Sequence, residues 1–489
     1  MTMSSPDGLA DDEATAETTT GAQHLRRAFQ IQKQAYLQDM APDRKRRTDR
    51  LDRLARLIER HDRAFAKAIS ADFGHRSHHE TQMMEILPVL AAIKNAKRHL
   101  GSWMQTRRLP TARHFRPGQT RLIRQPLGVV GIVAPWNYPL QLSAGPAVGA
   151  LAAGNRVMIK PSDSTPRFAA LFQELARRVF GEDELLVVDP DAETARAFVA
   201  LPFDHLLFTG SAQTGRLVAA AAAPNLTPVT LELGGKSPAI VDPSANLAKT
   251  ALRLAQSKLV NAGQTCVAPD YALVPTGYEE HLVDLLRKAI TRLYPRIIAN
   301  PDYSSIINER HFTRLKALLA DAHAKGATII EINPGRETAD PSLRKFLPTL
   351  VLGATGEMRL MQEEIFGPIL PILTYDDLGD VIAGLGQCDR PLALYWFGED
   401  HGQRERVLQE TVSGGVTIND CLWHAGQENA PFGGVGASGS GAYHGEYGFR
   451  TFSQEKTVFL QGRRSGISLL YPPYGVIFRM VMTALRRMI

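Results

Sequence analysis

Cysteine is scarce in this chain, with three residues in 489, at Cys266, Cys388 and Cys421. Three cysteines cannot all pair in disulfides, and none has the spacing of a metal site. This usage is typical of a reducing compartment, so we expect a cytoplasmic protein without a metal centre. Cys388 and Cys421 lie outside any recognisable motif, and we expect both to be core residues.

Long uninterrupted hydrophobic runs are also missing. The N-terminus is acidic and lacks the apolar stretch of a secretory signal peptide. Residues 126–155 contain no charged side chain, but prolines at Pro126, Pro135, Pro139 and Pro146 interrupt them. This segment therefore predicts a buried strand, a turn and a packed helix rather than a membrane span.

The charge is nearly balanced, with a formal net value of +6. Residues 1–22 contribute five acids and no base, and residues 463–489 contribute five arginines and no acid, so the two ends cancel. The remaining excess is spread over a long body, which argues against a nucleic-acid partner. We expect residues 1–22 to be a disordered acidic tail.

The basic segment 463–489 ends in a stretch with helical apolar spacing, residues 474–489. We expect its apolar stripe to pack on the body of the protein or on a partner subunit. Peripheral contact with an anionic membrane surface is the less favoured alternative, because one weak amphipathic helix binds only reversibly.

The body has an alternating α/β pattern. Residues 24–107 have helical apolar spacing, and the region after residue 127 then alternates strands with helices. The expected strands there are Arg156–Lys160, Leu185–Val188, His205–Phe208 and Val229–Glu232. Such alternation predicts a parallel sheet with ligands bound beyond the carboxyl ends of its strands. A second α/β segment runs from residue 264 to about 434, with expected strands at Tyr271–Val274, Ala327–Ile330, Thr349–Leu352, Leu392–Phe397 and Gly415–Ile418.

Two motifs resemble known sites but are better explained otherwise. His75, His78, His79 and Glu80 cluster without a second ligand group, and adjacent histidines point to different helix faces, so we interpret the cluster as a helix start. Residues 434–439 match G-x-G-x-x-G but lie near the C-terminus, away from any strand–helix start of a βαβ unit. The turn after the strand at 205–208, Phe208–Gly215, is a better diphosphate site, because it opens a helix.

Glu232 and Cys266 are the strongest candidates for chemistry. They lie in two runs of small residues, Leu231–Pro238 and Gly263–Cys266, where the backbone can approach a ligand closely. A thiolate nucleophile and a carboxylate base together suffice for a covalent acyl-enzyme cycle. Either residue alone would favour a plainer interpretation, a buried small hydrophobe or a solvated charge.

Further motifs decide between these interpretations. Both runs resemble the glutamate and cysteine signatures of the aldehyde dehydrogenase superfamily. Additional matches follow in the family's order at Pro135–Leu140, Lys160–Ser162, Phe208–Ser211 and Glu363–Pro368. Cys266–Tyr271, Gly441–Gly445 and Tyr471–Tyr474 resemble class 3 of this superfamily, and within it the coniferyl aldehyde dehydrogenases.

The resemblance implies the aldehyde dehydrogenase fold: a Rossmann-like cofactor domain, an α/β catalytic domain and a small oligomerisation sheet. We assign residues 23–107 and 127–234 to the NAD-binding domain and 235–450 to the catalytic domain. Residues 108–126 and 451–462 would supply the oligomerisation strands, and class 3 members favour a homodimer.

The resemblance also assigns roles to single residues. Cys266 would be the nucleophile, Asn137 would stabilise the oxyanion, and Glu232 would activate water. The residues implied at the cofactor are Trp136, Lys160, Ser162, Asp163, Thr209, Gly210, Ser211, Gly215, Glu364 and Phe366. The cofactor would be NAD, because an acid at position 163 repels the 2′-phosphate of NADP. NADP stays as the alternative, because Asp163 is one methylene shorter than the usual glutamate.

The expected activity is oxidation of an aldehyde, with aromatic substrates such as coniferyl aldehyde favoured. Tyr138, Trp423 and Tyr443 are candidates for an aromatic pocket. A membrane-associated fatty aldehyde dehydrogenase is the main alternative. A CoA-acylating relative or a non-catalytic structural descendant is less favoured, because Glu232, Cys266 and Asn137 are all present.

Overall fold

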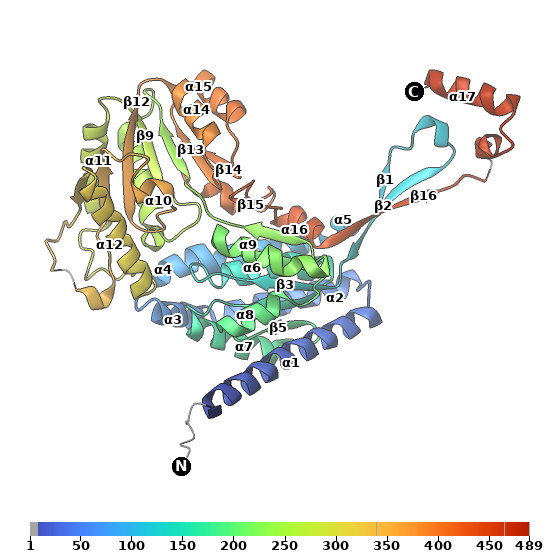
Figure 1. Ribbon diagram of the computed structural model, residues 1–489, viewed down its shortest axis with the longest axis horizontal. Coiled ribbons are helices and arrows are strands. Elements are labelled where there is room, and N and C mark those ends of the chain that lie inside the picture. Colours follow the sequence, from blue (N-terminus) through green and yellow to red (C-terminus); the bar gives the residue numbers. More distant parts are fainter. Residues whose placement is uncertain (1–7, 339, 464, 489) are drawn as a thin grey trace, which may run out of the picture.

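The computed structural model describes residues 8–338, 340–463 and 465–488. Two α/β units lie against each other, and a narrow arm extends from them, ending in the C-terminal helix (Figure 1). The predicted α/β class is confirmed, since both units are built on largely parallel sheets.

The first unit contains a six-stranded sheet of order β15-β7-β6-β3-β4-β5, parallel except at β15. Its strands are β3 (Val129–Val133), β4 (Arg156–Lys160), β5 (Leu185–Val187), β6 (His205–Thr209), β7 (Val229–Glu232) and β15 (Gly439–Ser440). The helices between them are α6 (Gln141–Ala153), α7 (Pro166–Val179), α8 (Ala192–Val199) and α9 (Ala212–Ala222). The strand–helix pattern of the sequence predicted this arrangement from β4 to β7. β15 corrects our domain assignment: it belongs to the sheet of the first unit, although it lies within residues 235–450, which we assigned to the catalytic domain.

Helices from the N-terminal region cover this sheet. They are α1 (Gly8–Gln38), α2 (Arg44–Arg60), α3 (Asp62–Asp72), α4 (His78–Thr81), the π-helix η1 (Gln82–Ile86) and α5 (Leu87–Trp103). Their buried residues recur at helical spacing, as with Leu51, Leu54 and Ile58 of α2, and join the core around α6.

The expectation of a disordered tail over residues 1–22 is wrong for part of its length. Helix α1 begins at Gly8, so residues 8–22 are helical, while residues 1–7 lie outside the described residues. The four alanines of this segment favour helix, but its four threonines and two glycines do not, so composition alone does not predict it. The segment continues directly into the part of α1 where Leu25, Ala28 and Phe29 are buried.

The second unit is built on a seven-stranded sheet of order β10-β11-β12-β9-β8-β13-β14. Its strands are β8 (Pro238–Val241), β9 (Tyr271–Pro275), β10 (Thr328–Glu331), β11 (Thr349–Leu352), β12 (Ile369–Tyr375), β13 (Ala393–Phe397) and β14 (Gly415–Ile418). Its helices are α10 (Leu247–Leu259), α11 (Glu279–Leu293), α12 (Glu309–Ala324), α13 (Arg359–Gln362), α14 (Leu378–Gln387) and α15 (His401–Glu410). Five of the strands match the predicted ones within a residue, whereas β8 and β12 were not predicted.

A three-stranded antiparallel sheet forms the arm. It consists of β1 (Arg107–Leu109), β2 (Gln119–Pro126) and β16 (Ser453–Leu460), with β2 in the centre. Helix α16 (Gly445–Thr451) connects it to the body (Figure 1). The two segments expected to form a small sheet therefore pair with each other.

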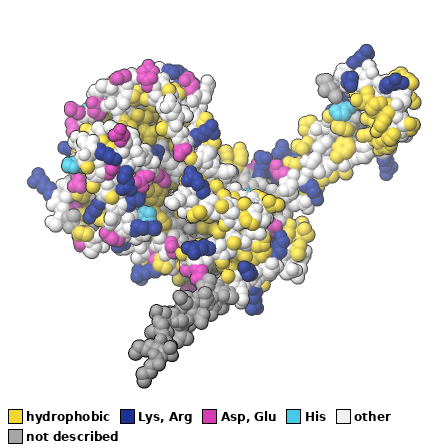
Figure 2. All heavy atoms as spheres, viewed as in Figure 1, with side chains coloured by type: hydrophobic (Ala, Val, Ile, Leu, Met, Phe, Trp, Pro, Cys, Tyr) yellow, Lys and Arg dark blue, Asp and Glu magenta, His cyan; other side chains and the backbone are white. Residues whose placement is uncertain are grey.

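The C-terminal helix α17 (Val476–Met488) lies at the tip of the arm, against the 3-10 helices η7 (Gly466–Leu470) and η2 (Arg113–Phe115). It does not pack on the body of its own chain (Figure 1). This corrects the first of our two packing alternatives, and packing on a partner subunit stays a prediction. Apolar side chains gather on the surface there (Figure 2). None of the helices among the described residues is long and apolar enough to cross a bilayer.

Candidate active site

The two chemical candidates lie where the two units meet. Glu232 is the last residue of β7, and Thr209 is its register partner at the end of β6. The backbone N–H of Gly210 donates to the Glu232 carbonyl at 3.0 Å. From Glu232 the chain passes through Leu233–Ser237 into β8 of the second sheet, so the strand ends face the loop that carries Cys266.

The Cys266 loop has an unusual backbone. It follows the 3-10 helix η4 (Val260–Gly263), in which Asn261 and Ala262 have φ values of 52° and 51°. A Cβ on Gly263 would lie 2.4 Å from the carbonyl oxygen of Gly367. Only glycine allows this close approach, which brings the cysteine loop against the segment that carries Glu364 and Phe366.

Cys266 lines a cavity of about 410 Å³ that also contains Tyr138, Trp423 and Tyr443, as the sequence led us to expect. Burial raises the pKa of its thiol to about 12, and the nearby Glu364 and Glu232 carboxyl groups add to the increase. Cys421 is buried as expected, but Cys388 is exposed, so its assignment to the core is wrong.

Glu232 is buried, with 3% of its surface exposed, and neither carboxyl oxygen has a hydrogen-bond partner in the structure. Burial raises its pKa well above the usual value. An unpartnered buried carboxyl group destabilises the fold. Such groups are characteristic of functional sites, where the missing partner is supplied by substrate or water.

Asn137 and Tyr138 hold the chain just before the nucleophile. They follow β3, and the Asn137 side-chain amide donates to the Gln264 carbonyl at 3.2 Å. The Tyr138 hydroxyl lies 2.7 Å from the Thr265 hydroxyl oxygen. Asn137 is therefore held beside the cysteine loop.

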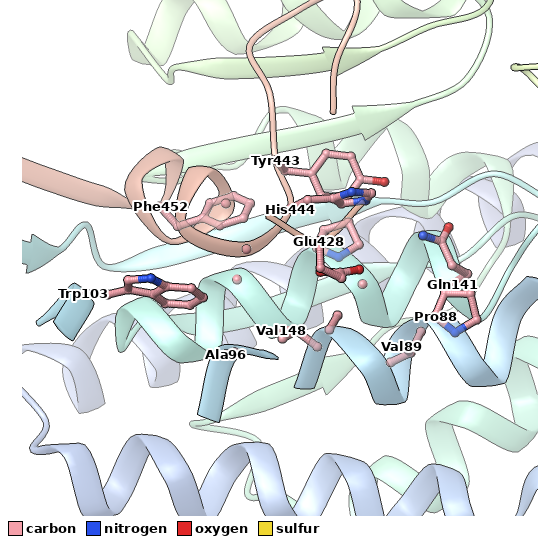
Figure 3. A pocket seen from close by; sticks show the side chains of 16 residues that line it. Pro88, Val89, Ala96, Trp103, Gln141, Val148, Glu428, Tyr443, His444 and Phe452 are labelled. Atoms are coloured by element: carbon pink, nitrogen blue, oxygen red, sulfur yellow. The ribbon is translucent and has the colours of Figure 1, made fainter. Parts of the chain in front are cut away.

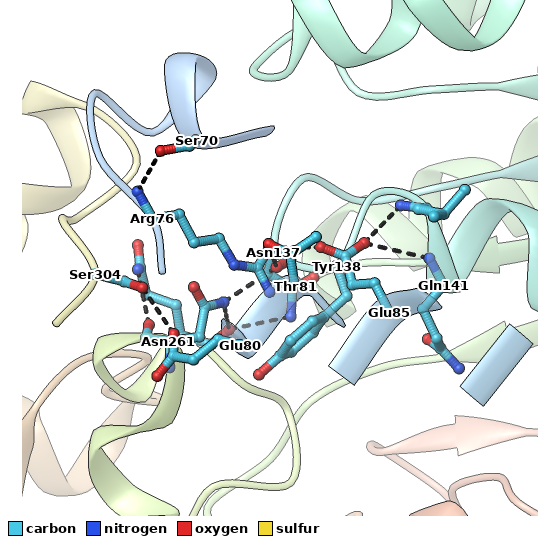
Figure 4. Close-up of polar contacts among 12 residues, drawn as sticks. Ser70, Arg76, Glu80, Thr81, Glu85, Asn137, Tyr138, Gln141, Asn261 and Ser304 are labelled. Carbon is cyan, nitrogen blue, oxygen red and sulfur yellow. Dashed lines mark hydrogen bonds and ion pairs between the residues drawn. The ribbon is translucent and has the colours of Figure 1, made fainter. Parts of the chain in front are cut away.

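A buried polar network holds the segment that carries Asn137 and Tyr138 (Figure 4). Arg76 donates through one nitrogen to Glu85 at 2.7 Å and to the Asn137 carbonyl at 3.0 Å. Both charged side chains are fully buried. Glu85 in turn accepts the Leu140 N–H at 2.7 Å, which fixes the turn into α6.

Glu80 carries the other half of this network. Its carboxylate accepts the Asn261 N–H at 3.1 Å and the Ser304 hydroxyl at 2.7 Å. α4 does begin at this segment, with Ser77 as its N-cap, as we interpreted the sequence. The support that Glu80 gives to the cysteine loop was missed, because an acid in the first turn of a helix usually faces solvent.

Lys160, Ser162 and Asp163 follow the end of β4. Lys160 is buried, its ammonium donates to the Pro190 carbonyl at 2.8 Å, and burial lowers its pKa. Asp163 is exposed, with the Ser162 hydroxyl 3.3 Å from its carboxylate. These groups lie at the carboxyl edge of the first sheet, where ligands of doubly wound folds bind.

The N-terminus of α9 opens at the same edge. Ser211 is its N-cap, and the Ser211 hydroxyl accepts the Thr214 N–H at 3.2 Å. Gly215 is packed so closely that a Cβ there would lie 2.8 Å from Leu233. The Thr209 hydroxyl oxygen is buried without a partner. Gly210 lies between this hydroxyl and the helix, so the turn can present N–H groups to an anion.

Glu364 and Phe366 come from the loop between α13 and β12. A Cβ on Gly234 would lie 2.2 Å from a Glu364 carboxylate oxygen, so that glycine allows the carboxylate to lie over the crossing chain. Burial is the main cause that raises the Glu364 pKa to about 8. Phe366 has a φ of 52°, and its ring packs edge-on against Trp136 with centroids 5.4 Å apart.

The structure thus brings the predicted site residues to the facing edges of the two sheets. The glycine-rich segment 434–439, which we excluded as a dinucleotide site, instead supports β7, since Gly439 pairs with Glu232 in the antiparallel register. Among the described residues there is no cluster of three or more histidine, cysteine, aspartate or glutamate side chains able to hold a metal ion.

Comparison with known proteins identifies the family. The model of the aldehyde dehydrogenase family matches residues 9–458. The chain is 47% identical to a probable coniferyl aldehyde dehydrogenase of Pseudomonas aeruginosa, covering 96% of this chain and 97% of the relative. It superposes on a substrate-bound Staphylococcus aureus AldH with a TM-score of 0.88 and 38% identity, covering 94% of this chain and 99% of the other. A Mycobacterium tuberculosis aldehyde dehydrogenase complexed with NAD+ gives a TM-score of 0.80 and 28% identity over 91% of each chain. The chain belongs to the aldehyde dehydrogenase family.

Proposed function

We propose that the protein oxidises aromatic aldehydes of the coniferyl type to carboxylic acids, with NAD as the oxidant and Cys266 as the nucleophile. The observation that carries this proposal is the pairing of a cavity-lining thiol with Glu232, whose buried carboxyl group has no partner. The high identity to a probable coniferyl aldehyde dehydrogenase supports the substrate class.

The residues present suit a dinucleotide. The orphaned Thr209 hydroxyl and the N-terminus of α9 are donors for a diphosphate. Lys160 and Asp163 would hold the adenosine ribose, and the Asp163 carboxylate would repel a 2′-phosphate. NADP stays as the alternative, because aspartate reaches less far than glutamate. A relative of the same fold is complexed with NAD+.

Phe366 and Trp136 would hold the nicotinamide end, and Glu364 would hold its ribose. When bound there, the nicotinamide supplies the hydride acceptor. The positive φ of Phe366 is a strained conformation for a bulky residue, and strain of this kind is common at functional sites.

Catalysis would begin when the Cys266 thiol gives its proton to water and the sulfur attacks the aldehyde carbon. The carbonyl oxygen becomes an oxyanion, which the Cys266 backbone N–H and the Asn137 amide would stabilise. Removing one such donor typically costs about 10²–10³ in rate. The hydrogen bonds from Arg76 and Asn261 to the Asn137 carbonyl hold that residue in place.

Oxidation of this adduct leaves a thioester on Cys266. Glu232 would then take a proton from water, the resulting hydroxide would attack the thioester, and the acid would leave as the thiol is restored. A CoA-acylating enzyme would need no such base. The buried, unpartnered Glu232 therefore favours hydrolysis.

A membrane-associated fatty aldehyde dehydrogenase is the second candidate. The walls of the Cys266 cavity are largely apolar, with Met83, Leu87 and Leu142 among them, so a long alkyl chain would also find contacts. A substrate series separates the two candidates, because aromatic and long aliphatic aldehydes can be compared directly by kcat/KM.

The decisive experiment measures NADH formation at 340 nm with coniferyl aldehyde, cinnamaldehyde and decanal, using NAD and NADP in turn. We expect the highest kcat/KM with coniferyl aldehyde and NAD, and no activity in a folded Cys266→Ala variant. Preference for decanal would favour the fatty aldehyde candidate. Activity retained in Cys266→Ala would overturn the assignment of the nucleophile.

We also propose that the arm joins two subunits in a homodimer. Its sheet has only three strands and stands clear of the body, so β1 and β16 are open edges. Exposed edges of this kind commonly pair with another chain. Light scattering at micromolar concentration should give twice the mass of 53.7 kDa, and a monomer mass would contradict the proposal.

A further inference from the structure

One charged side chain in the substrate cavity has no role in the proposed chemistry. Of the residues that line the Cys266 cavity, Glu428 is the only one with a carboxyl group. Glu428 also lines a smaller adjoining cavity, together with Gln141, Tyr443 and His444, and Figure 3 shows these side chains around that space. It follows the 3-10 helix η6 (Trp423–Gly426) in the second unit.

The backbone of Glu428 is firmly held. Its carbonyl oxygen accepts a hydrogen bond from the Asn95 side chain of α5 at 3.3 Å. A Cβ on Gly445 would lie 2.0 Å from the same oxygen, so the start of α16 packs directly against it. Two elements from distant parts of the chain therefore fix where this residue points.

The carboxyl group itself is different. In the described part of the chain, the hydrogen bond from Asn95 to the backbone is the one hydrogen bond that Glu428 makes. No charged neighbour contributes to the pKa shift of its carboxyl group. Burial raises its pKa to about 7. A half-buried carboxyl group without a partner costs stability, and such a cost is common where a ligand completes the site.

Its neighbours offer no opposite charge. Burial lowers the pKa of His444 to about 4, so this ring is neutral, and its Nδ1 is buried without a partner. Burial raises the Tyr443 pKa well above its usual value, so this residue stays a neutral phenol. The cavity therefore presents one strong acceptor, with an unpartnered ring nitrogen beside it, among apolar walls.

We propose that Glu428 is a specificity residue that accepts a hydrogen bond from a hydroxyl group of the aldehyde substrate. This inference rests on the proposed function, and it specifies the substrate class: aromatic aldehydes with a hydroxyl on the ring rather than hydrocarbon aldehydes. A hydrocarbon of the same size would enter the cavity but leave the carboxyl group desolvated and unpaired. A phenol donates the hydrogen bond that this group lacks.

The expected discrimination is large enough to measure. Above pH 7, where a carboxyl group with a pKa of about 7 is mostly ionised, a hydrogen bond to this charged acceptor corresponds to roughly 10- to 100-fold in kcat/KM. The test compares 4-hydroxycinnamaldehyde with cinnamaldehyde, which differ only in the hydroxyl, in the wild type, Glu428→Leu and Glu428→Gln. Asn429→Leu is the matched control, because the neighbouring Asn429 is exposed and does not line the cavity.

We expect the selectivity ratio to fall at least tenfold in Glu428→Leu and by a smaller factor in Glu428→Gln, which keeps one acceptor oxygen. Asn429→Leu should keep the wild-type ratio. Equal ratios in all four proteins would overturn the proposal. If Glu428→Leu does not fold, as judged by circular dichroism, the isosteric Glu428→Gln decides by the same comparison.

A binding measurement separates this inference from the proposed function. In a Cys266→Ser background, fluorescence quenching gives the Kd of each aldehyde without turnover, with and without Glu428→Gln. A wild type that oxidises no aldehyde would refute the proposed function alone. Loss of tighter binding by the hydroxylated aldehyde in Glu428→Gln would still support the role of Glu428, and an unchanged Kd ratio would refute it.

Discussion

Asp270 accepts the backbone N–H of Ile365 at 2.9 Å, which joins the loop after Cys266 to the loop that carries Glu364. The same carboxylate pairs with Lys236, whose ammonium also donates to the Leu360 carbonyl at 2.7 Å. One ion pair thus fixes three segments of the site: the chain after Glu232, the cysteine loop and the Glu364 loop.

Asp270→Asn should therefore weaken NAD binding and turnover more than it lowers the stability of the fold. Without the ion pair, the Glu364 loop loses its fixed position, and a displacement of about 1 Å can cost roughly 10² in rate. We expect a higher KM for NAD together with a lower kcat, and a KM for aldehyde that changes little. Lys249→Met, which removes an exposed lysine of α10, serves as the control. Wild-type kinetics in folded Asp270→Asn would show that the ion pair does not position the loop.

The Cys266 thiol should react slowly with alkylating agents in the cofactor-free protein. Its pKa is raised to about 12, so the thiolate fraction at neutral pH is very small and grows about tenfold with each pH unit. Iodoacetamide labelling of Cys266, followed by mass spectrometry in a Cys388→Ser background, should accelerate from pH 7 to 10 without levelling off. A plateau near pH 8 would mean that the thiol ionises far more easily than its burial implies.

Glu232→Gln should separate the two halves of the reaction. The amide cannot take a proton from water, but it leaves the attack by Cys266 and the oxidation intact. Stopped-flow absorbance should record a burst of about one NADH per site, followed by a steady rate at least 10²-fold below the wild type. Normal steady-state turnover would exclude Glu232 as the required base, and absence of a burst would place its role before oxidation.

The buried pair of Arg76 and Glu85 should contribute strongly to stability. Arg76→Met leaves the Glu85 carboxylate buried without its cation, which typically costs about 3–5 kcal/mol. Urea unfolding followed by circular dichroism measures the loss. The double variant Arg76→Met/Glu85→Leu should recover part of it, because no buried charge then remains. A single variant as stable as the wild type would refute this account.

The positions of Lys160, Thr209 and Glu232 could be predicted from the sequence because each lies in a short motif at the end of a strand. Parallel strands place their carboxyl ends at one edge, so Lys160, Thr209 and Glu232 lie along the same edge of the sheet. Cys266 and Glu364 were placed by their motifs, although β12, the strand that follows Glu364, was not predicted from the pattern of its residues.

The supporting network could not be predicted in the same way. Arg76, Glu80 and Glu85 lie in a helical segment where charged side chains normally face solvent, and nothing in their spacing indicates burial. Their partners, such as Asn137 and Asn261, are far away in the sequence. The position of α17 could not be predicted from its apolar pattern either. An amphipathic stripe shows that a helix has a covered face but does not show what covers it.

The pairing of β15 with β7 has a consequence for how the chain is made. The sheet that carries Glu232 receives its edge strand, Gly439–Ser440, only after 207 further residues (439 − 232) have been synthesised. Until then the backbone of β7 is an open edge, as is that of β2, which waits for Ser453–Leu460. Folding of the first unit is therefore completed by segments synthesised long after β2 and β7, and until those segments are made the nascent protein exposes two open strand edges to aggregation.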